Sequence, residues 1–351
     1  MMMERSAACT MTLRVQKSRR GIVRGKRQQQ QQGRRRRCCV VEAGGMEDGG
    51  AGRRVVYGTV SMNHAGHDKE AHPERKERLF AIEEELERSG IQSDARVRKI
   101  AHVENENEYD DEEARTTAAE KEEERILKVH SRAYVADLEG LNASMQRALD
   151  AEREKILRAS GDEAATLASV RPHILDEDTY FTTASLRAAK ESARLACALV
   201  DDVVLRANAG LVPETAFALC RPPGHHAVPY EASRPFGFCL LSTVAIAVKH
   251  AQTLPNVHRV AIFDFDVHHG NGTESAFLDD PNVLFISSHQ DGSFPNTGHA
   301  DTTGTDGTNI NINFPADAGT RHNGWSQIPS LYSVIHVHSL HVLICACADV
   351  C

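Results

Sequence analysis

The stretch VAIFDFDVHHGNG, residues 260–272, decides the fold, because an uninterrupted apolar run ends there in ionisable side chains and two glycines. Four such side chains occupy six consecutive positions: Asp264, Asp266, His268 and His269. The apolar run predicts a buried strand of a parallel sheet, and ligands of such sheets bind beyond the carboxyl ends of the strands. We therefore expect a functional site where this strand ends.

Alternate residues of a strand point to the same face, so Asp264, Asp266 and His268 are expected to point one way and their apolar neighbours the other. Those neighbours, expected to pack in the core, are Phe263, Phe265 and Val267. An Asp-x-His pair offers the oxygen and nitrogen donors that Zn²⁺ takes. Carboxylates are costly to bury unless they are paired, hydrogen-bonded or metal-bound, and a hydrogen-bonded structural cluster is the alternative. Four ionisable groups in so short a span favour the metal.

The basic N-terminal segment, residues 1–54, differs from the rest of the 351-residue chain. It carries fourteen Lys/Arg and four Asp/Glu, whereas the remainder has a net charge of -18. Arg-rich, acid-poor N-termini are typical of plastid or mitochondrial targeting peptides. A nuclear import signal, which would place the protein in the nucleus or cytoplasm, and a disordered tail are the alternatives.

The acidic charge of the remaining chain excludes direct nucleic-acid binding by the catalytic body, since phosphate contacts need clustered cations. It suits a cationic substrate instead. No apolar run has the length of a membrane span, so no membrane partner is expected. The nine cysteines are odd in number and form no CxxC pair, which favours free thiols.

Strands that alternate with helices predict an α/β fold with a parallel sheet covered by helices on both faces. Apolar patterning predicts strands over 54–60, 215–220, 259–265 and 282–288. It predicts helices over 72–90, 184–210 and 240–252. The charge run 104–125 is expected to be a solvated acidic insertion, with disorder as one form that it could take.

A second group of candidate residues lies in CRPPGHHA, 220–227, directly after a predicted strand. Two prolines and Gly224 fix a loop that presents His225 and His226 together. Neutral imidazole near a metal-bound water is a common general base. Two further segments, GFCLLS at 237–242 and SSHQDGSFPNTG at 287–298, are expected to line the same mouth and to contribute phenylalanines to a slot.

Together, RPPGHHA, GFCLLSTVAIA, IFDFDVHHGNGTESAF and SSHQDGSFPNTG resemble the zinc-dependent histone deacetylase family, in its class II-like branch. HPERKERL and VHSRAYVADL are similar to its N-terminal segments. The resemblance spans about 55–325 and implies an arginase-deacetylase fold, incomplete at the C-terminus. It also implies hydrolysis of acetyl groups from acetyl-lysine side chains of histones or other proteins, and a link to chromatin regulation.

The resemblance assigns a role to each candidate residue. Asp266 and His268 match two zinc ligands, and His226 matches the general base, assisted by His225. Asp264 and Asn271 match the hydrogen-bond partners of these two histidines.

The resemblance also implies a substrate channel and a structural potassium ion. Phe238 and Phe294 match the walls of the acyl-lysine channel, and Gly237 matches a contact at its floor. The potassium-site candidates are Asp264, Asp266, His268 and Ser287.

The segment 326–351 does not resemble the family and is expected to be a non-family tail. The family's third zinc ligand, an aspartate on a later strand, and its oxyanion tyrosine are not recognised, so truncation is expected to impair activity. Replacement of the ligand by tail histidines is a further alternative: His336, His338 and His341. A sheet cut short there is expected to leave an exposed edge.

Other functions remain open. The acidic charge also suits small acetylated amines of the polyamine type, and an inactive acyl-lysine binder or a truncated product is a different class. A binuclear manganese site of the arginase type is disfavoured, because Gly270 stands where that relative needs a carboxylate.

Overall fold

The computed structural model describes most of the chain between Arg54 and Phe314, together with one later strand. The described ranges are 54–60, 62–100, 112–160, 172–211, 214–314 and 342–346. The basic segment before residue 54, most of the C-terminal tail and the three tail histidines lie outside them.

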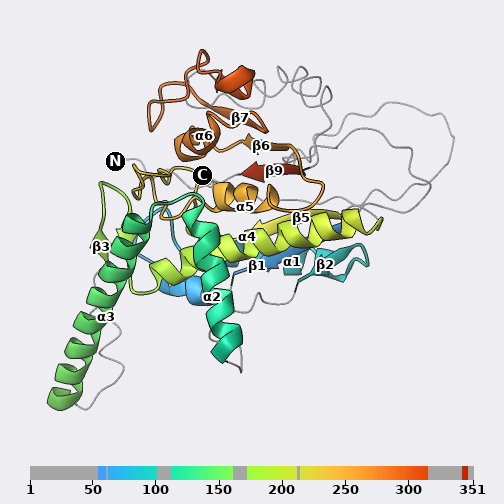
Figure 1. Cartoon of the computed structure of the whole chain (residues 1–351). Coiled ribbons are helices and arrows are strands. Elements are labelled where there is room, and N and C mark those ends of the chain that lie inside the picture. The colour runs from blue at the N-terminus through green and yellow to red at the C-terminus, as the bar shows by residue number, and fades with distance from the viewer. Residues whose placement is uncertain are drawn as a thin grey trace, which may run out of the picture.

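The strands form two parallel sheets, joined by helices (Figure 1). The first sheet has the order β2-β1-β5, with strands β1 (Arg54–Thr59), β2 (Val97–Lys99) and β5 (Glu214–Leu219). The second has the order β8-β7-β6-β9, with β6 (Val260–Asp264), β7 (Val283–Gln290), β8 (Asn309–Phe314) and β9 (Val342–Ala346). A short antiparallel pair, β3 (His173–Ile174) and β4 (Tyr180–Phe181), lies apart. The predicted parallel α/β fold is confirmed.

Six α-helices occur in the described ranges (Figure 1). They are α1 (Glu77–Arg88), α2 (Glu112–Leu127), α3 (Arg132–Ser160), α4 (Ser185–Asn208), α5 (Thr243–Ala251) and α6 (Asn271–Phe277). Three 3₁₀ turns accompany them: η1 (Met62–Gly66), η2 (Ile91–Ser93) and η5 (Thr305–Gly307). Helix α3 packs its first turns through Tyr134, Val135 and Leu138, and its C-terminal part projects from the body.

Helix α4 holds the two sheets together, because its apolar side chains enter both main cores. Leu195 and Leu199 pack with the strands of the first sheet. Ala189, Ala193 and Cys197 pack with α5 and with one face of the second sheet. The stretch 184–210 is apolar at helical spacing on more than one side, so a helix between two cores satisfies its sequence.

Strand β6 is buried along its whole length, as its apolar run predicts. It ends at Asp264, however, two residues before Asp266. Asp266 and His268 therefore lie in the following turn. Phe265 still packs with Phe263, as expected, but the expectation is wrong for Val267. Val267 is 39% exposed and does not pack in the core.

The described part of the acidic charge run, residues 112–125, is largely exposed, as expected of a solvated segment, and it is ordered as part of helix α2. Ile126 is 1% exposed, and Glu122 pairs with Arg194 of α4 at 2.6 Å. A few inward contacts at helical spacing thus fix a segment whose composition alone left disorder open.

Strand β9 lies in the segment expected to be a non-family tail. It pairs in parallel with β6, and Asp264 stands opposite Ala346. Strand β6 is therefore an inner strand of the described sheet, and β9 is its outer strand on that side.

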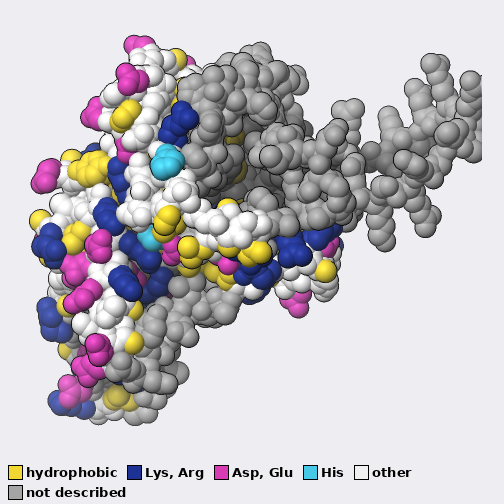
Figure 2. Space-filling model, turned by 45° about the vertical axis from the view of Figure 1, so that its right-hand side comes forward, with side chains coloured by type: hydrophobic (Ala, Val, Ile, Leu, Met, Phe, Trp, Pro, Cys, Tyr) yellow, Lys and Arg dark blue, Asp and Glu magenta, His cyan; other side chains and the backbone are white. Residues whose placement is uncertain are grey.

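Acidic and basic side chains are interspersed over the face of the molecule that Figure 2 shows. None of the helices in the described ranges is long and apolar enough to cross a membrane.

Three cysteines in the described ranges, Cys197, Cys220 and Cys239, are thiols.

Candidate active site

The turn that follows β6 is shaped by hydrogen bonds between its own residues. The backbone N–H of Asp266 donates to Oδ1 of Asp264 at 3.1 Å, and the backbone N–H of His268 donates to Oδ1 of Asp266 at 2.8 Å. Each of these hydrogen bonds joins residues two positions apart, and together they turn the chain directly after the strand. Asp266 is buried and His268 is half-buried.

Asp266 and His268 fit a divalent metal ion as two of its ligands. Their Oδ1 and Nδ1 atoms lie 3.2 Å apart, so one ion can contact both a carboxylate oxygen and an imidazole nitrogen. Among the residues that the structure describes, no group of three metal-binding side chains occurs. A complete tetrahedral site needs a further ligand.

The tandem-histidine loop, residues 221–226, follows β5 in the chain and lies against this turn in space. Gly224 packs so closely that a Cβ there would lie 2.6 Å from the backbone nitrogen of Thr243. At the other end, the backbone N–H groups of Gly272 and Thr273 donate to the carbonyl of His225 at 2.9 and 3.1 Å. The start of α6 therefore fixes the position of the two histidines.

The structure brings the loop and the turn into direct contact. His225 donates from Nδ1 to Oδ2 of Asp264 at 2.9 Å, and His226 donates from Nδ1 to Oδ1 of Asn271 at 2.7 Å. The two histidine rings lie 3.9 Å apart, and the rings of His226 and His268 lie 6.0 Å apart. All six residues predicted for catalysis and metal binding thus lie in one buried cluster.

Burial determines the charge of His226, which is 2% exposed. Loss of hydration, and secondly the neighbouring His225, lower the pKa of His226 to about 2, although the bond to Asn271 opposes this. The imidazole is therefore neutral near pH 7. With its Nδ1 proton donated to Asn271, its Nε2 atom is the one that can accept a proton.

Two glycines permit the close approach of these side chains. A Cβ on Gly270 would overlap Oδ2 of Asp264 and would lie 3.3 Å from Nδ1 of His225. A Cβ on Gly237, where φ is +51°, would lie 2.6 Å from Cδ2 of His226. The structure thus leaves no room at Gly270 for the carboxylate of an arginase-type site.

Aromatic rings stand beside the histidines. Phe294 meets the rings of His226 and His268 edge-on, at 5.1 and 6.0 Å, and is half-buried in its turn. It also contacts the ring of Phe236, at 5.0 Å, a residue that the sequence patterns did not single out. Phe238 contacts the ring of His72 at 4.8 Å. The spacing Phe236-Gly-Phe238 could have indicated that both rings belong to one loop.

The fourth potassium-site candidate, Ser287, lies opposite Asp264 in the register of β6 and β7. Its hydroxyl bonds to Nδ1 of His289 at 2.9 Å. The potassium site stays a prediction.

His269, the fourth ionisable group of the turn, belongs to a separate buried cluster. Its Nδ1 atom lies 2.8 Å from Oγ1 of Thr297, within hydrogen-bond distance.

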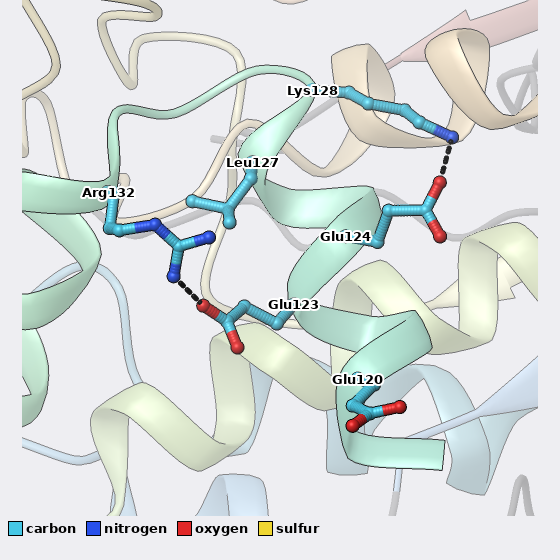
Figure 3. A pocket seen from close by; sticks show the side chains of 6 residues that line it. All are labelled: Glu120, Glu123, Glu124, Leu127, Lys128 and Arg132. Carbon is cyan, nitrogen blue, oxygen red and sulfur yellow. Dashed lines mark hydrogen bonds and ion pairs between the residues drawn. The ribbon is translucent and has the colours of Figure 1, made fainter. Parts of the chain in front are cut away.

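A shallow hollow of about 290 Å³ lies elsewhere, at the junction of α2 and α3 (Figure 3). Its lining residues are Glu120, Glu123, Glu124, Leu127, Lys128 and Arg132. Two of its carboxylates pair with Arg132 and Lys128. It holds neither a histidine nor a thiol, so its chemistry is that of a solvated charged surface.

Comparison with known proteins agrees with this geometry. The sequence matches the histone deacetylase domain family over residues 72–340, which extends past the predicted limit at 325. It is 36% identical over 272 residues to "Histone deacetylase 14, chloroplastic" of Arabidopsis thaliana, covering 77% of this chain and 56% of that protein. It is 37% identical over 259 residues to "Histone deacetylase 10, chloroplastic" of Oryza sativa subsp. japonica, covering 72% and 50%.

The fold also resembles that of the HDA15 HD domain crystal structure, with a TM-score of 0.55 and 27% identity over 75% of this chain and 62% of that one. The chain spans about half the length of the curated relatives it matches. The family match covers most of the sequence and includes both loops of the buried cluster. The chain therefore belongs to the histone deacetylase domain family.

Proposed function

We propose that this protein hydrolyses the acetyl group from acetyl-lysine side chains, with a zinc ion held in the turn after β6. The observation that carries the proposal is the convergence of the tandem-histidine loop and the Asp266–His268 pair, through the contacts of His225 with Asp264 and of His226 with Asn271. A neutral imidazole and a metal-binding pair in one buried cluster suit amide hydrolysis.

Asp266 and His268 would hold the zinc ion, as their 3.2 Å separation allows. When bound, zinc supplies polarisation of the amide carbonyl and acidifies a water molecule. The other chemistry comes from the chain itself.

Asp349 is our candidate for the third ligand. Strands β6 and β9 are parallel with Asp264 opposite Ala346, so both strands end at the same edge of the sheet. Asp266 follows the end of β6 by two residues, and Asp349 follows the end of β9 by three. Asp349 itself lies outside the residues that the structure describes.

Two histidines would move the protons. His226 would take a proton from the attacking water at Nε2, because Asn271 keeps its proton at Nδ1. His225 donates from Nδ1 to the Asp264 carboxylate, which orients its ring, and it would deliver a proton to the leaving amine. The phenylalanines Phe294 and Phe238 would flank the lysine stem, with Gly237 at the floor, and potassium would bind near Asp264 and Ser287.

We further propose a plastid location and an acetylated protein as the substrate. Two relatives carry the word chloroplastic in their names, and the basic N-terminal segment suits a targeting peptide. Import of the full chain into isolated chloroplasts, with an otherwise identical chain lacking residues 1–54 as the control, tests the location.

The reaction is tested with an acetyl-lysine peptide and an acetylated polyamine, each incubated with the full chain. His226→Ala should lower kcat by at least about 100-fold, because general-base catalysis is lost, while bound zinc stays near one per chain. Asp349→Asn should instead lower the bound zinc. Exposed His299 and Asp301 provide the controls His299→Ala and Asp301→Asn, which should change neither. Wild-type protein that holds zinc but releases no acetate from the peptide would contradict the proposal.

A further inference from the structure

A buried ion pair between Glu74 and Arg221 lies next to the tandem-histidine loop, and the proposed reaction does not use it. Arg221 donates from Nε and Nη2 to the two carboxylate oxygens of Glu74, each at 2.7 Å. Arg221 is 2% exposed and Glu74 is 0% exposed. A bidentate pair of this kind fixes both distance and orientation.

The pair is embedded in further polar contacts. Arg221 also donates from Nη1 to the carbonyl of His64 at 2.7 Å. The hydroxyl of Tyr180 donates to a carboxylate oxygen of Glu74 at 3.0 Å, and Nε2 of His67 lies 3.2 Å from the same oxygen. The hydrogen bonds from His67 and Arg221 outweigh the desolvation of Glu74 and lower its pKa to about 2, so its carboxylate stays charged.

The cluster does not form a second nucleophilic site. Ser185, His67 and Glu74 do lie in the order of a hydroxyl, an imidazole and a carboxylate, with 2.6 Å between the Ser185 hydroxyl and the His67 ring. Ser185 is 0% exposed, however, and its oxygen already accepts the backbone N–H of Thr182 at 2.7 Å. A substrate cannot reach it, so the contacts serve to hold the structure.

The chain segment between Arg221 and the two histidines is short and rigid. Only Pro222, Pro223 and Gly224 lie between Arg221 and His225. Proline fixes φ, and Gly224 is wedged against the backbone of Thr243. Ser192 also donates to the carbonyl of Arg221 at 3.0 Å. A shift of the Arg221 side chain is therefore expected to reach His225 and His226 almost undiminished.

The other partner of the ion pair connects to the channel wall. The backbone N–H of Glu74 donates to Nδ1 of His72 at 3.1 Å, and the His72 ring contacts Phe238 at 4.8 Å. One ion pair thus lies between the loop that carries the proposed base and the segment that supports an aromatic wall.

We infer that Glu74 and Arg221 are a positioning pair, which holds the tandem-histidine loop at its working distance from Asp264 and Asn271. The inference deepens the proposed deacetylase function and rests on it for its kinetic consequence. Neither residue touches the reacting atoms. Their effect reaches the substrate through His225 and His226.

The test replaces the whole pair, because removing one partner alone leaves a buried charge and endangers folding. In Glu74→Leu/Arg221→Met both charges are removed by apolar side chains, an exchange that is often neutral for stability. We expect kcat for the acetyl-lysine peptide to fall by roughly 100-fold, since a small misplacement of catalytic groups has that cost, and KM to change by less than about threefold.

A matched control is available in Glu122 and Arg194, a second shielded pair 2.6 Å apart that joins α2 to α4. Glu122→Leu/Arg194→Met should keep the wild-type kcat. Side-chain NMR supplies a readout that does not need turnover: the Nδ1 proton of His225, held by Asp264, should shift or disappear in the first double variant and persist in the control.

The outcomes separate the two proposals. If wild-type protein proves inactive on acetylated substrates, the proposed function fails, and the His225 proton signal still decides the positioning role. If Glu74→Leu/Arg221→Met folds, keeps its kcat and keeps the wild-type His225 signal, the pair only stabilises the fold and the inference is overturned. If that variant fails to fold, Arg221→Lys, which keeps the charge but not the bidentate geometry, is measured in the same way with the same criteria.

Discussion

The two loops of the buried cluster are held in different ways. The turn after β6 is shaped by backbone N–H groups that bond to carboxylates only two residues earlier, at Asp264 and Asp266. The tandem-histidine loop is held by partners far along the chain. His225 meets Asp264 39 residues away, His226 meets Asn271 45 residues away, and Arg221 meets Glu74 147 residues away.

Because of this difference, distant substitutions are expected to affect the proposed metal binding and the proposed proton transfer unequally. The proposed metal-binding pair, Asp266 and His268, is arranged by its own turn, so distant changes should leave it intact. The histidines depend on contacts from β6, α6 and the segment before α1, so several remote substitutions should disturb them. Changes at the contacts between the two loops test the contrast most directly.

The largest effect, a fall in kcat, is expected from the substitution Asp264→Asn. Asparagine keeps an Oδ1 acceptor for the backbone of Asp266, but its amide group cannot accept the Nδ1 proton of His225 as Oδ2 does at 2.9 Å. We expect kcat to fall by about 1,000-fold through a misoriented, wrongly protonated His225, with zinc content retained. Steady-state kinetics on an acetyl-lysine peptide, together with metal analysis, measure both quantities.

Asp201→Asn is the matched control, because Asp201 accepts a similar bond from His250 at 2.7 Å away from the site. Its kcat should stay at the wild-type value. Loss of zinc from Asp264→Asn would show instead that the turn and the histidine loop are not held independently.

An effect of intermediate size on the unfolding free energy is expected when pH is lowered, because Glu74 becomes protonated. Its pKa is about 2 in the fold against an ordinary 4.5, so the charged form stabilises the protein above about pH 4.5, and this stabilisation is lost as pH falls towards 2. The full shift corresponds to about 3 kcal/mol of unfolding free energy. Urea unfolding of wild type and of Glu74→Leu/Arg221→Met, from pH 6 to pH 3, should show the difference in unfolding free energy changing in favour of the variant as pH falls. Parallel stability curves would mean that Glu74 titrates as it does in the unfolded chain.

The same contrast explains what could be predicted from the sequence. The cluster of Asp264, Asp266 and His268 is recognisable because its contacts are local, and a short apolar run ending in them indicates a strand end. The alternation of residues extends the strand too far. The hydrogen bonds that turn the chain begin only at Asp264, and the alternation does not reveal them. Resemblance to the family then supplies the roles of the histidines.

Long-range contacts are not predictable in this way. Glu74 and Arg221 carry no local signal of their pairing, and neither does the ring contact between Phe236 and Phe294. Composition does not reveal helix α2, because its charged residues outweigh the few inward positions that hold it, such as Ile126. Pairing of β9 with β6 escapes prediction for a related reason. No motif is recognised after residue 325 from the sequence alone, although Val342–Ala346 is apolar enough to form a strand.

The smallest effect, Gly270→Ala, probes the point where the loop and the turn meet. A single added methyl group would overlap Oδ2 of Asp264 and crowd Nδ1 of His225, although φ at Gly270 is -76° and suits any residue. The cost is therefore steric, about 2 kcal/mol of unfolding free energy, as for other overpacked sites. Gly140→Ala is the control: it lies within α3 with open space around it, and alanine there should stabilise by about 0.5–1 kcal/mol. Urea unfolding of both variants gives the comparison. If Gly270→Ala were as stable as Gly140→Ala, the loop and the turn would be free to move apart, and the close contact between His225 and Asp264 could not be a fixed feature of the protein.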